Sequence, residues 1–146
     1  MRALLVAATA LLAACCPALA HANSGALTAG PAAPSVPSPP FVDHTEWSLW
    51  QGRSSLRVFP SASGRLAARQ PGSGALADEA WGEVLAAAPD ADTPGMRAQF
   101  DCHWQFAELA QPGKPSWNLE PWRPVVDDTE MVASGCNPGG PEESFP

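Results

Sequence analysis

The fold is decided by residues 93–110, which read TPGMRAQFDCHWQFAELA. Thr93 suits an N-cap, and Pro94 suits the first helical position, where its missing N–H has no intrahelical partner. One face then carries Met96, Phe100, His103, Ala107 and Ala110, and the opposite face carries Arg97, Asp101, Gln105 and Glu108. This spacing predicts an amphipathic helix over 94–110 that ends at Pro112-Gly113.

Upstream of this helix, the pattern predicts a second helix and a small set of strands. Residues 76–88 carry apolar side chains at four-residue spacing, and Pro89 ends that helix. Residues 56–59 read as a short strand, and 65–68 as a weaker strand that returns after a turn. Residues 41–50 fit either a strand or a helical turn.

Downstream, residues 114–126 are broken by three prolines and are expected to be extended or to form an edge strand. Asp127 or Asp128 can start a short last helix through Val132. Gly135 is well placed as its C-terminal cap.

Residues 1–22 are typical of a signal peptide. A basic start precedes an apolar run over 3–14, which is shorter than the about 20 residues that span a bilayer. Two processing routes stay open. The LAAC at 12–15 resembles a lipobox, which would leave an acylated Cys15, whereas cleavage after Ala20 or Ala22 would release the chain. We expect a secreted protein or a cell-envelope lipoprotein, with membrane contact only through a lipid anchor at Cys15.

Residues 23–40 are rich in Pro, Ala and Ser and carry no charge, so they are expected to form a disordered linker. A single globular domain is expected over 41–137, followed by a disordered tail over 138–146. The domain is poor in aliphatic residues, so its tryptophans must supply much of the burial.

Cys102 and Cys136 are the only cysteines left after ordinary signal cleavage. Outside the cytoplasm such a pair favours a disulfide. The spacing of the cysteines and histidines matches no metal site, and no cofactor motif is present. The predicted fold is therefore α+β: a small antiparallel sheet packed against two or three short helices and stapled by one disulfide.

The net charge of −7 excludes nucleic acid as a partner, because an acidic protein repels phosphate backbones. The charge is uneven. Residues 41–70 hold four arginines against two acids, whereas 71–146 hold three cations against thirteen acids. Internal ion pairing is the favoured interpretation, and an acidic face that docks a basic partner is the other.

Several stretches together resemble an uncharacterised family of small exported bacterial proteins. They are DHTEW at 43–47, LRVFP at 56–60, TPGM at 93–96 with Gln99-Phe100 and Cys102-His103, and WNLEPWRP at 117–124. The resemblance covers residues 42–140. It implies an exported single domain, and it implies no particular activity.

The segment 117–124 is also the candidate binding site, through Trp117, Glu120, Trp122 and Arg123. Exposed tryptophans offer a large contact area with few rotatable bonds. Core packing is the competing role for these rings. We expect Trp81 and Trp104 inside the domain and one of Trp117 and Trp122 outside.

Catalysis is the alternative function. His103 is expected to be a buried, hydrogen-bonded residue of the 94–110 helix, and His44 lies near two acids. Either would need a carboxylate or a serine such as Ser54, Ser55 or Ser116 close by. The Asn-Leu-Glu-Pro at 118–121 differs from the Asn-Glu-Pro of glycosidases by the inserted Leu119, and the chain is too short for their barrel.

No catalytic residue is therefore assigned. We expect a non-enzymatic extracytoplasmic interaction module that binds a protein or a cell-wall ligand. The alternative is a small hydrolase that acts on the cell envelope.

Overall fold

The computed structural model describes residues 36–141. The predicted signal peptide, Cys15, most of the predicted linker and the end of the predicted tail lie outside these residues. Within them, no helix is both long and apolar enough to span a bilayer.

A long β-hairpin is the first element of the sheet. Strands β1 (Val42–Trp50) and β2 (Arg53–Pro60) pair antiparallel around Gln51 and Gly52, both of which have positive φ angles. Two such residues form the type I′ turn, whose twist matches that of a hairpin. Strand β3 (Trp117–Leu119) pairs antiparallel with the other side of β2, giving the order β1-β2-β3. Residues 41–50 are thus a strand, and the 114–126 segment contains the predicted edge strand.

The prediction of a strand over 65–68 is wrong, because residues Ala62–Ala68 form helix α1. The Ser61 side chain accepts a hydrogen bond from the Gly64 N–H (3.0 Å) and so acts as an N-cap rather than as part of a turn. A Cβ atom on Gly64 would lie 2.1 Å from the carbonyl oxygen of Phe41. Glycine therefore lets α1 approach the start of β1.

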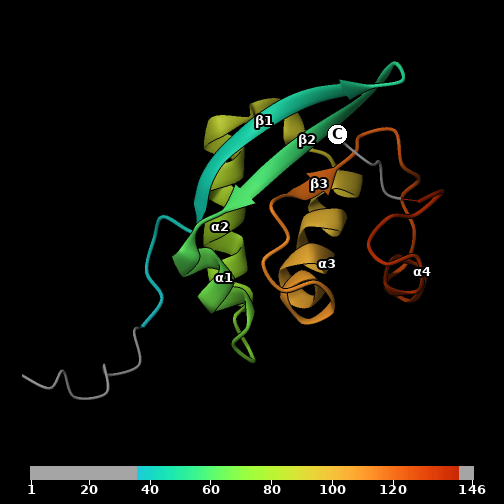
Figure 1. The fold of residues 1–146 in the computed structure, drawn as a ribbon. Coiled ribbons are helices and arrows are strands. Elements are labelled where there is room, and N and C mark those ends of the chain that lie inside the picture. The colour runs from blue at the N-terminus through green and yellow to red at the C-terminus, as the bar shows by residue number, and fades with distance from the viewer. Residues whose placement is uncertain (1–35, 142–146) are drawn as a thin grey trace, which may run out of the picture. The chain divides into compact units, whose positions relative to one another are not determined.

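Helices α2 (Gly74–Ala87) and α3 (Pro94–Ala110) confirm the two helices that the spacing predicts. A 3-10 turn, η1 (Pro89–Ala91), joins them. Thr93 caps α3 by accepting a hydrogen bond from the Met96 N–H (3.3 Å). The sheet arches over α2 and α3, and its inner face meets them in the core (Figure 1).

Aromatic rings fill much of this core. Trp81, Phe100, Trp104 and Trp117 are buried, and neighbouring ring centroids lie 5.3 to 6.1 Å apart. Trp81 and Trp104 are inside, as predicted. These contacts supply the burial that the scarce aliphatic residues cannot.

Helix α4 (Asp128–Ala133) lies against α3, on the side away from α1 (Figure 1). Asp127 caps it, and Gly135 follows with a positive φ, as expected of a C-terminal cap. Cys102 of α3 forms a disulfide with Cys136. The fold is α+β, with an antiparallel sheet packed on helices and this disulfide, as the sequence predicts.

Candidate functional site

The 117–124 segment lies mostly in the interior. Of the four predicted binding residues, Trp117, Glu120 and Arg123 are buried, and Trp122 is half-buried. Trp117 and Leu119 point into the core because β3 pairs with the central strand β2. The expectation that this segment presents a binding surface is therefore corrected. Of the four residues, only Trp122 is exposed enough to contact a ligand.

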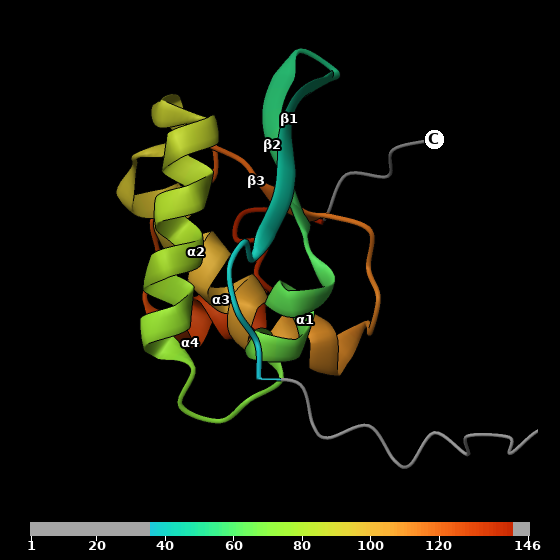
Figure 2. The ribbon, with the colours of Figure 1, turned by 90° about the vertical axis from the view of Figure 1, so that its left-hand side faces the viewer.

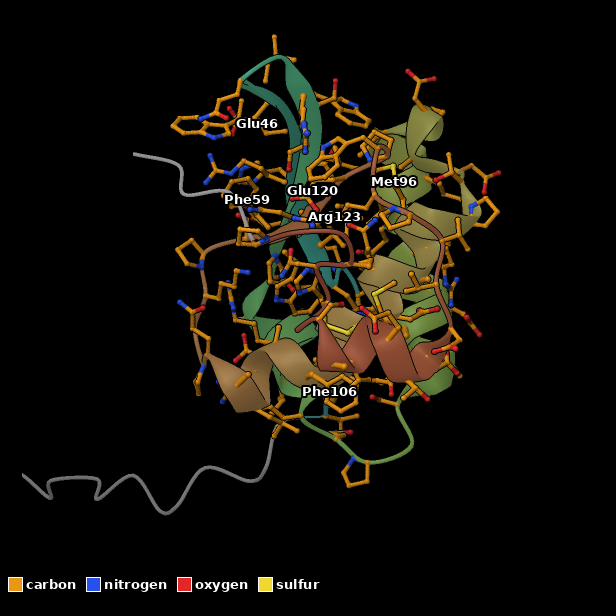
Figure 3. The ribbon with its side chains drawn as sticks, turned by 90° about the vertical axis from the view of Figure 1, so that its right-hand side faces the viewer. Glu46, Phe59, Met96, Phe106, Glu120 and Arg123 are labelled. Atoms are coloured by element: carbon orange, nitrogen blue, oxygen red, sulfur yellow. A yellow bond between two sulfur atoms is a disulfide. The ribbon has the colours of Figure 1, made fainter. Side chains whose placement is uncertain are left out.

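Glu120 and Arg123 form a buried ion pair, with Arg123 Nε 2.6 Å from Glu120 Oε2 and both side chains fully enclosed. Figure 3 shows the two side chains side by side at the centre of the molecule. Gln99 of α3 brackets the backbone of Glu120, since its amide donates to the Glu120 carbonyl oxygen and accepts from the Glu120 N–H. These two hydrogen bonds join Glu120, the residue that follows β3, to α3.

Arg123 also fixes the start of the predicted tail. Its guanidinium donates to the backbone carbonyl oxygens of Pro138 (3.1 Å), Gly140 (2.8 Å) and Pro141 (3.3 Å). Residues 138–141, expected to be disordered, are therefore held against the domain. Glu120 and Arg123 act as structural residues of this interior.

His103 is a buried structural residue, as predicted. Its Nε2 lies 3.2 Å from the carbonyl oxygen of Asn118. Burial lowers the pKa of His103 to about 3, and the positive charge of Lys114 adds to this effect, against the hydrogen bond to Asn118. The ring is neutral near pH 7, and Nε2 carries its proton because the carbonyl oxygen can only accept.

Two of the three serines suggested as nucleophiles, Ser55 and Ser116, bond elsewhere in the described residues. Ser55 Oγ donates to Glu120 (3.4 Å), and Ser116 Oγ donates to Asn118 Oδ1 (2.8 Å). Neither is bonded to His103 within residues 36–141. His44 pairs with the adjacent Asp43 (2.6 Å) on the surface.

His103 makes stability depend on pH. Because its pKa falls from 6.5 in the unfolded chain to about 3 in the folded protein, the unfolded state binds more protons between these values. The contribution of His103 is present above pH 6.5 and is lost as the pH falls towards 3, by about 3 kcal/mol at pH 4. We expect His103→Gln, which keeps a donor but does not titrate, to flatten urea-derived unfolding free energies between pH 7 and pH 4. His44→Gln is the matched exposed control, and an unchanged slope in His103→Gln would contradict the prediction.

A cavity of about 720 Å³ lies between the α1–α2 loop and α3. Its charges are compensated. Arg97 pairs with Asp78 (2.6 Å) and Asp101 (2.8 Å), and the Asp101 hydrogen bond raises the pKa of Arg97 against the effect of burial. Arg69 pairs with Glu108 (2.6 Å). The charged side chains named here are therefore already in ion pairs, and none is left to pair with a charged ligand.

Glu108, which the spacing placed on the polar face of α3, is buried in the structure. Arg65 and Arg69 both donate to its carboxylate. Burial would raise the pKa of Glu108, but the hydrogen bonds from Arg69 and Arg65 outweigh that effect and lower it. These two ion pairs agree with the internal pairing of arginines and acids that the charge distribution favoured.

Aromatic and cationic side chains gather instead on the outer face of the hairpin. His44 lies opposite Phe59, and Glu46 lies opposite Arg57. The His44 and Phe59 rings stack with centroids 4.1 Å apart, and the Arg57 guanidinium lies 5.1 Å from the Phe59 centroid. Figure 3 shows Glu46 and Phe59 on the same side of the hairpin.

Trp122 extends this face towards the hairpin turn. The guanidinium of Arg53 lies 4.4 Å from the Trp122 ring centroid, and that of Arg123 lies 4.6 Å from it. Arg53 is exposed. We call the following five side chains the hairpin strip: His44, Arg53, Arg57, Phe59 and Trp122.

Arg53, Arg57 and Phe59 were not predicted from the sequence as candidate binding residues. A signal was present, because 53, 57 and 59 share parity within one strand and therefore one face. The contact between Arg53 and Trp122 had no such signal, since it joins residues far apart in the chain. Within residues 36–141, no His, Cys, Asp and Glu side chains cluster in a way that could hold a metal ion.

Comparison with known proteins places the chain among uncharacterised relatives. Proteins of Mycobacterium tuberculosis and Mycobacterium bovis, both described as uncharacterised, are each 71% identical over 108 residues, which cover 74% of this chain and 72% of theirs. An uncharacterised protein of Mycobacterium leprae is 58% identical over 100 residues, covering 68% of this chain and 80% of its own.

No solved structure matches the chain. The model of a family described as protein of unknown function (DUF2599) matches residues 42–139, from the first residue of β1 to just beyond the disulfide. This match confirms the resemblance to an uncharacterised family that the sequence indicated. The chain belongs to the family DUF2599.

Proposed function

We propose that the protein is a non-enzymatic interaction module that binds a cell-envelope ligand through the hairpin strip. The observation that supports this most is the stacking of arginines on the partly exposed rings of Trp122 and Phe59 along one face of the sheet. These rings lie outside the main core cluster, and each leaves part of its surface to solvent. Such a face serves recognition better than stability.

The chemistry of the strip favours a ligand that carries both flat rings and acidic groups. Trp122 and Phe59 offer apolar ring surface beside the cations that stack on them, and the exposed Arg53 can donate a planar pair of hydrogen bonds to a carboxylate. Sugar rings and carboxylates occur together in peptidoglycan. We infer that the ligand is an acidic glycan or glycopeptide of the cell wall.

Export is part of the proposal. The signal-like residues 1–22 would bring the domain to the envelope, where a wall ligand is within reach. Acylation of Cys15 would hold it at the membrane, and cleavage after Ala20 or Ala22 would release it. Mass spectrometry of the N-terminus of exported material distinguishes the two routes.

The test is binding to insoluble cell-wall material from a mycobacterium. We expect the protein to cosediment with it, and Arg53→Ala to raise the Kd by about tenfold, which is about 1.4 kcal/mol. Arg69→Ala is the matched control, because it removes another exposed positive charge, at the C-terminal cap of α1 and outside the strip. Phe59→Ala should weaken binding to a similar degree as Arg53→Ala.

Two results would remove the proposal. One is failure of the wild-type protein to cosediment. The other is an equal Kd for Arg53→Ala and Arg69→Ala, which would mean that any binding is due to general charge and not to the strip.

A further inference from the structure

Strand β1 presents an unpaired backbone edge. Trp50 and Arg53 flank the two-residue turn and are hydrogen-bonded to each other as the first and last residues of that turn. In an antiparallel pair, every second residue bonds to the partner strand and the residues between point away from it. The register is regular back to His44, so the N–H and C=O groups of Thr45, Trp47 and Leu49 point away from β2.

The fold protects the beginning of β1 but not this stretch. The Glu83 carboxylate of α2 accepts hydrogen bonds from the N–H groups of Phe41 (2.8 Å) and Val42 (2.7 Å). A register shift between Val42 and His44 interrupts the ladder there. Within residues 36–141, no backbone hydrogen bond from a turn, loop or cap reaches Thr45, Trp47 or Leu49.

Two of these three residues, Trp47 and Leu49, carry exposed apolar side chains on the inner side of the hairpin. Trp47 is 42% exposed and Leu49 is 71% exposed. Both line an open groove under the hairpin, with Asp90 and Pro121 on its other side. Figure 2 views the molecule from the β1 side and shows the hairpin rising beyond the end of α2.

Edge strands of proteins usually carry a lysine, a proline or a bulge that prevents further pairing. Residues 44–50 contain no lysine or proline, and the bulge lies before them. Glu46 is the one acidic residue in this stretch, and its side chain belongs to the outer face, opposite Arg57. The open edge is thus competent to add a strand.

We propose that the occupant of this edge is a second copy of the chain, joined through antiparallel pairing of β1 with the partner's β1 about a two-fold axis at Trp47. In this register Trp47 faces the partner's Trp47, and Thr45 faces the partner's Leu49. All three outward-pointing residues are then hydrogen-bonded, and the two sheets become one. The same step covers Trp47 and Leu49, which the single chain leaves exposed.

Charge supports the self-pairing at this register. Glu46 faces the partner's Ser48, and His44 faces the partner's Trp50, so no carboxylate lies directly opposite another. Moving the axis to Glu46 would place two glutamates opposite each other, which is destabilising. A two-fold axis also gives both copies the same contact, as a closed dimer requires.

The test is sedimentation equilibrium of the protein from about 1 µM to about 1 mM, the range of weak to moderate association. We expect a monomer–dimer equilibrium, and we expect Leu49→Lys to raise the dimer Kd by at least about tenfold because a lysine on an edge strand opposes pairing. Leu109→Lys is the matched control: Leu109 is 70% exposed, against 71% for Leu49, but lies on α3. Thr45→Pro should also weaken the dimer while preserving the hairpin, because its N–H faces the open edge.

Hydrogen exchange locates the contact. The amides of Thr45, Trp47 and Leu49 should become protected as the concentration rises. A monomer throughout the range, equal Kd values for Leu49→Lys and Leu109→Lys, or a dimer that leaves these amides unprotected would each overturn the proposal.

Discussion

Arg123→Met is expected to lower the free energy of unfolding by about 3–5 kcal/mol, because it leaves the enclosed Glu120 carboxylate without its cationic partner. Removing one member of a buried ion pair is costly, since the remaining charge is neither hydrated nor compensated. The variant also frees the carbonyl oxygens of Pro138, Gly140 and Pro141, which the guanidinium now satisfies. Residues 138–141 should therefore lose their attachment as well.

Urea unfolding at pH 7 measures this loss, and proteolysis near residue 140 reports the release of the C-terminal segment. Arg69→Met is the control, because Arg69 also pairs with a glutamate but is 51% exposed, and the buried Glu108 keeps Arg65 as its second cationic partner, so a smaller loss is expected. The double variant Glu120→Leu with Arg123→Met should recover part of the loss, since no charge then remains unpaired. An Arg123→Met protein as stable as Arg69→Met would show that the pair does not hold this interior together.

Loss of the Cys102–Cys136 disulfide is expected to cost about 4 kcal/mol. The bond spans a sequence separation of 34 residues, and the chain-entropy model gives roughly this value for a loop of that length. The disulfide lies in a small cluster with Met131, apart from the main core. Among the helices and strands of residues 36–141, α4 makes its main contacts with α3, which the disulfide joins to Cys136 just after α4.

The variant Cys102→Ser with Cys136→Ser, compared with the oxidised protein by urea unfolding, measures the contribution. Wild-type protein treated with a reductant should unfold near the midpoint of the serine variant, and the serine variant itself should not respond to the reductant. Hydrogen exchange should show that Asp128–Ala133 loses protection before α3 does. If the reduced and oxidised proteins unfold at the same urea concentration, the cross-link contributes nothing to stability.

Helices α2 and α3 were predictable because their signals are local. Thr93, Pro94 and the apolar spacing after them specify α3 through a cap, a fixed φ angle and one buried face. The disulfide was predictable from cysteine number and the expected compartment. Residues 65–68 were misassigned because Ser61 and Gly64 read as a turn, whereas they cap a helix that is packed against the backbone of Phe41.

The candidate site was less predictable, because it depends on which side chains are buried by segments from other parts of the chain. Glu120 and Arg123 are three positions apart, and charge pattern alone would place them in water. They are buried because β3 lies beside the central strand and the 138–141 segment closes over them. The side chains of the hairpin strip keep part of their surface exposed because helices α2 and α3 pack against the opposite face of the sheet (Figure 1).

The sequence by itself determined the elements that depend on neighbouring residues: the two main helices and the disulfide between 102 and 136. Capping, periodicity and cysteine chemistry act within a few residues or on a single pair, so they can be read along the chain. Only the tertiary structure decided that Trp117 belongs to the core, that Trp122 joins Arg53, and that the edge of β1 is unpaired. Burial and pairing depend on residues brought together from distant parts of the chain, and no local sequence pattern predicts these contacts.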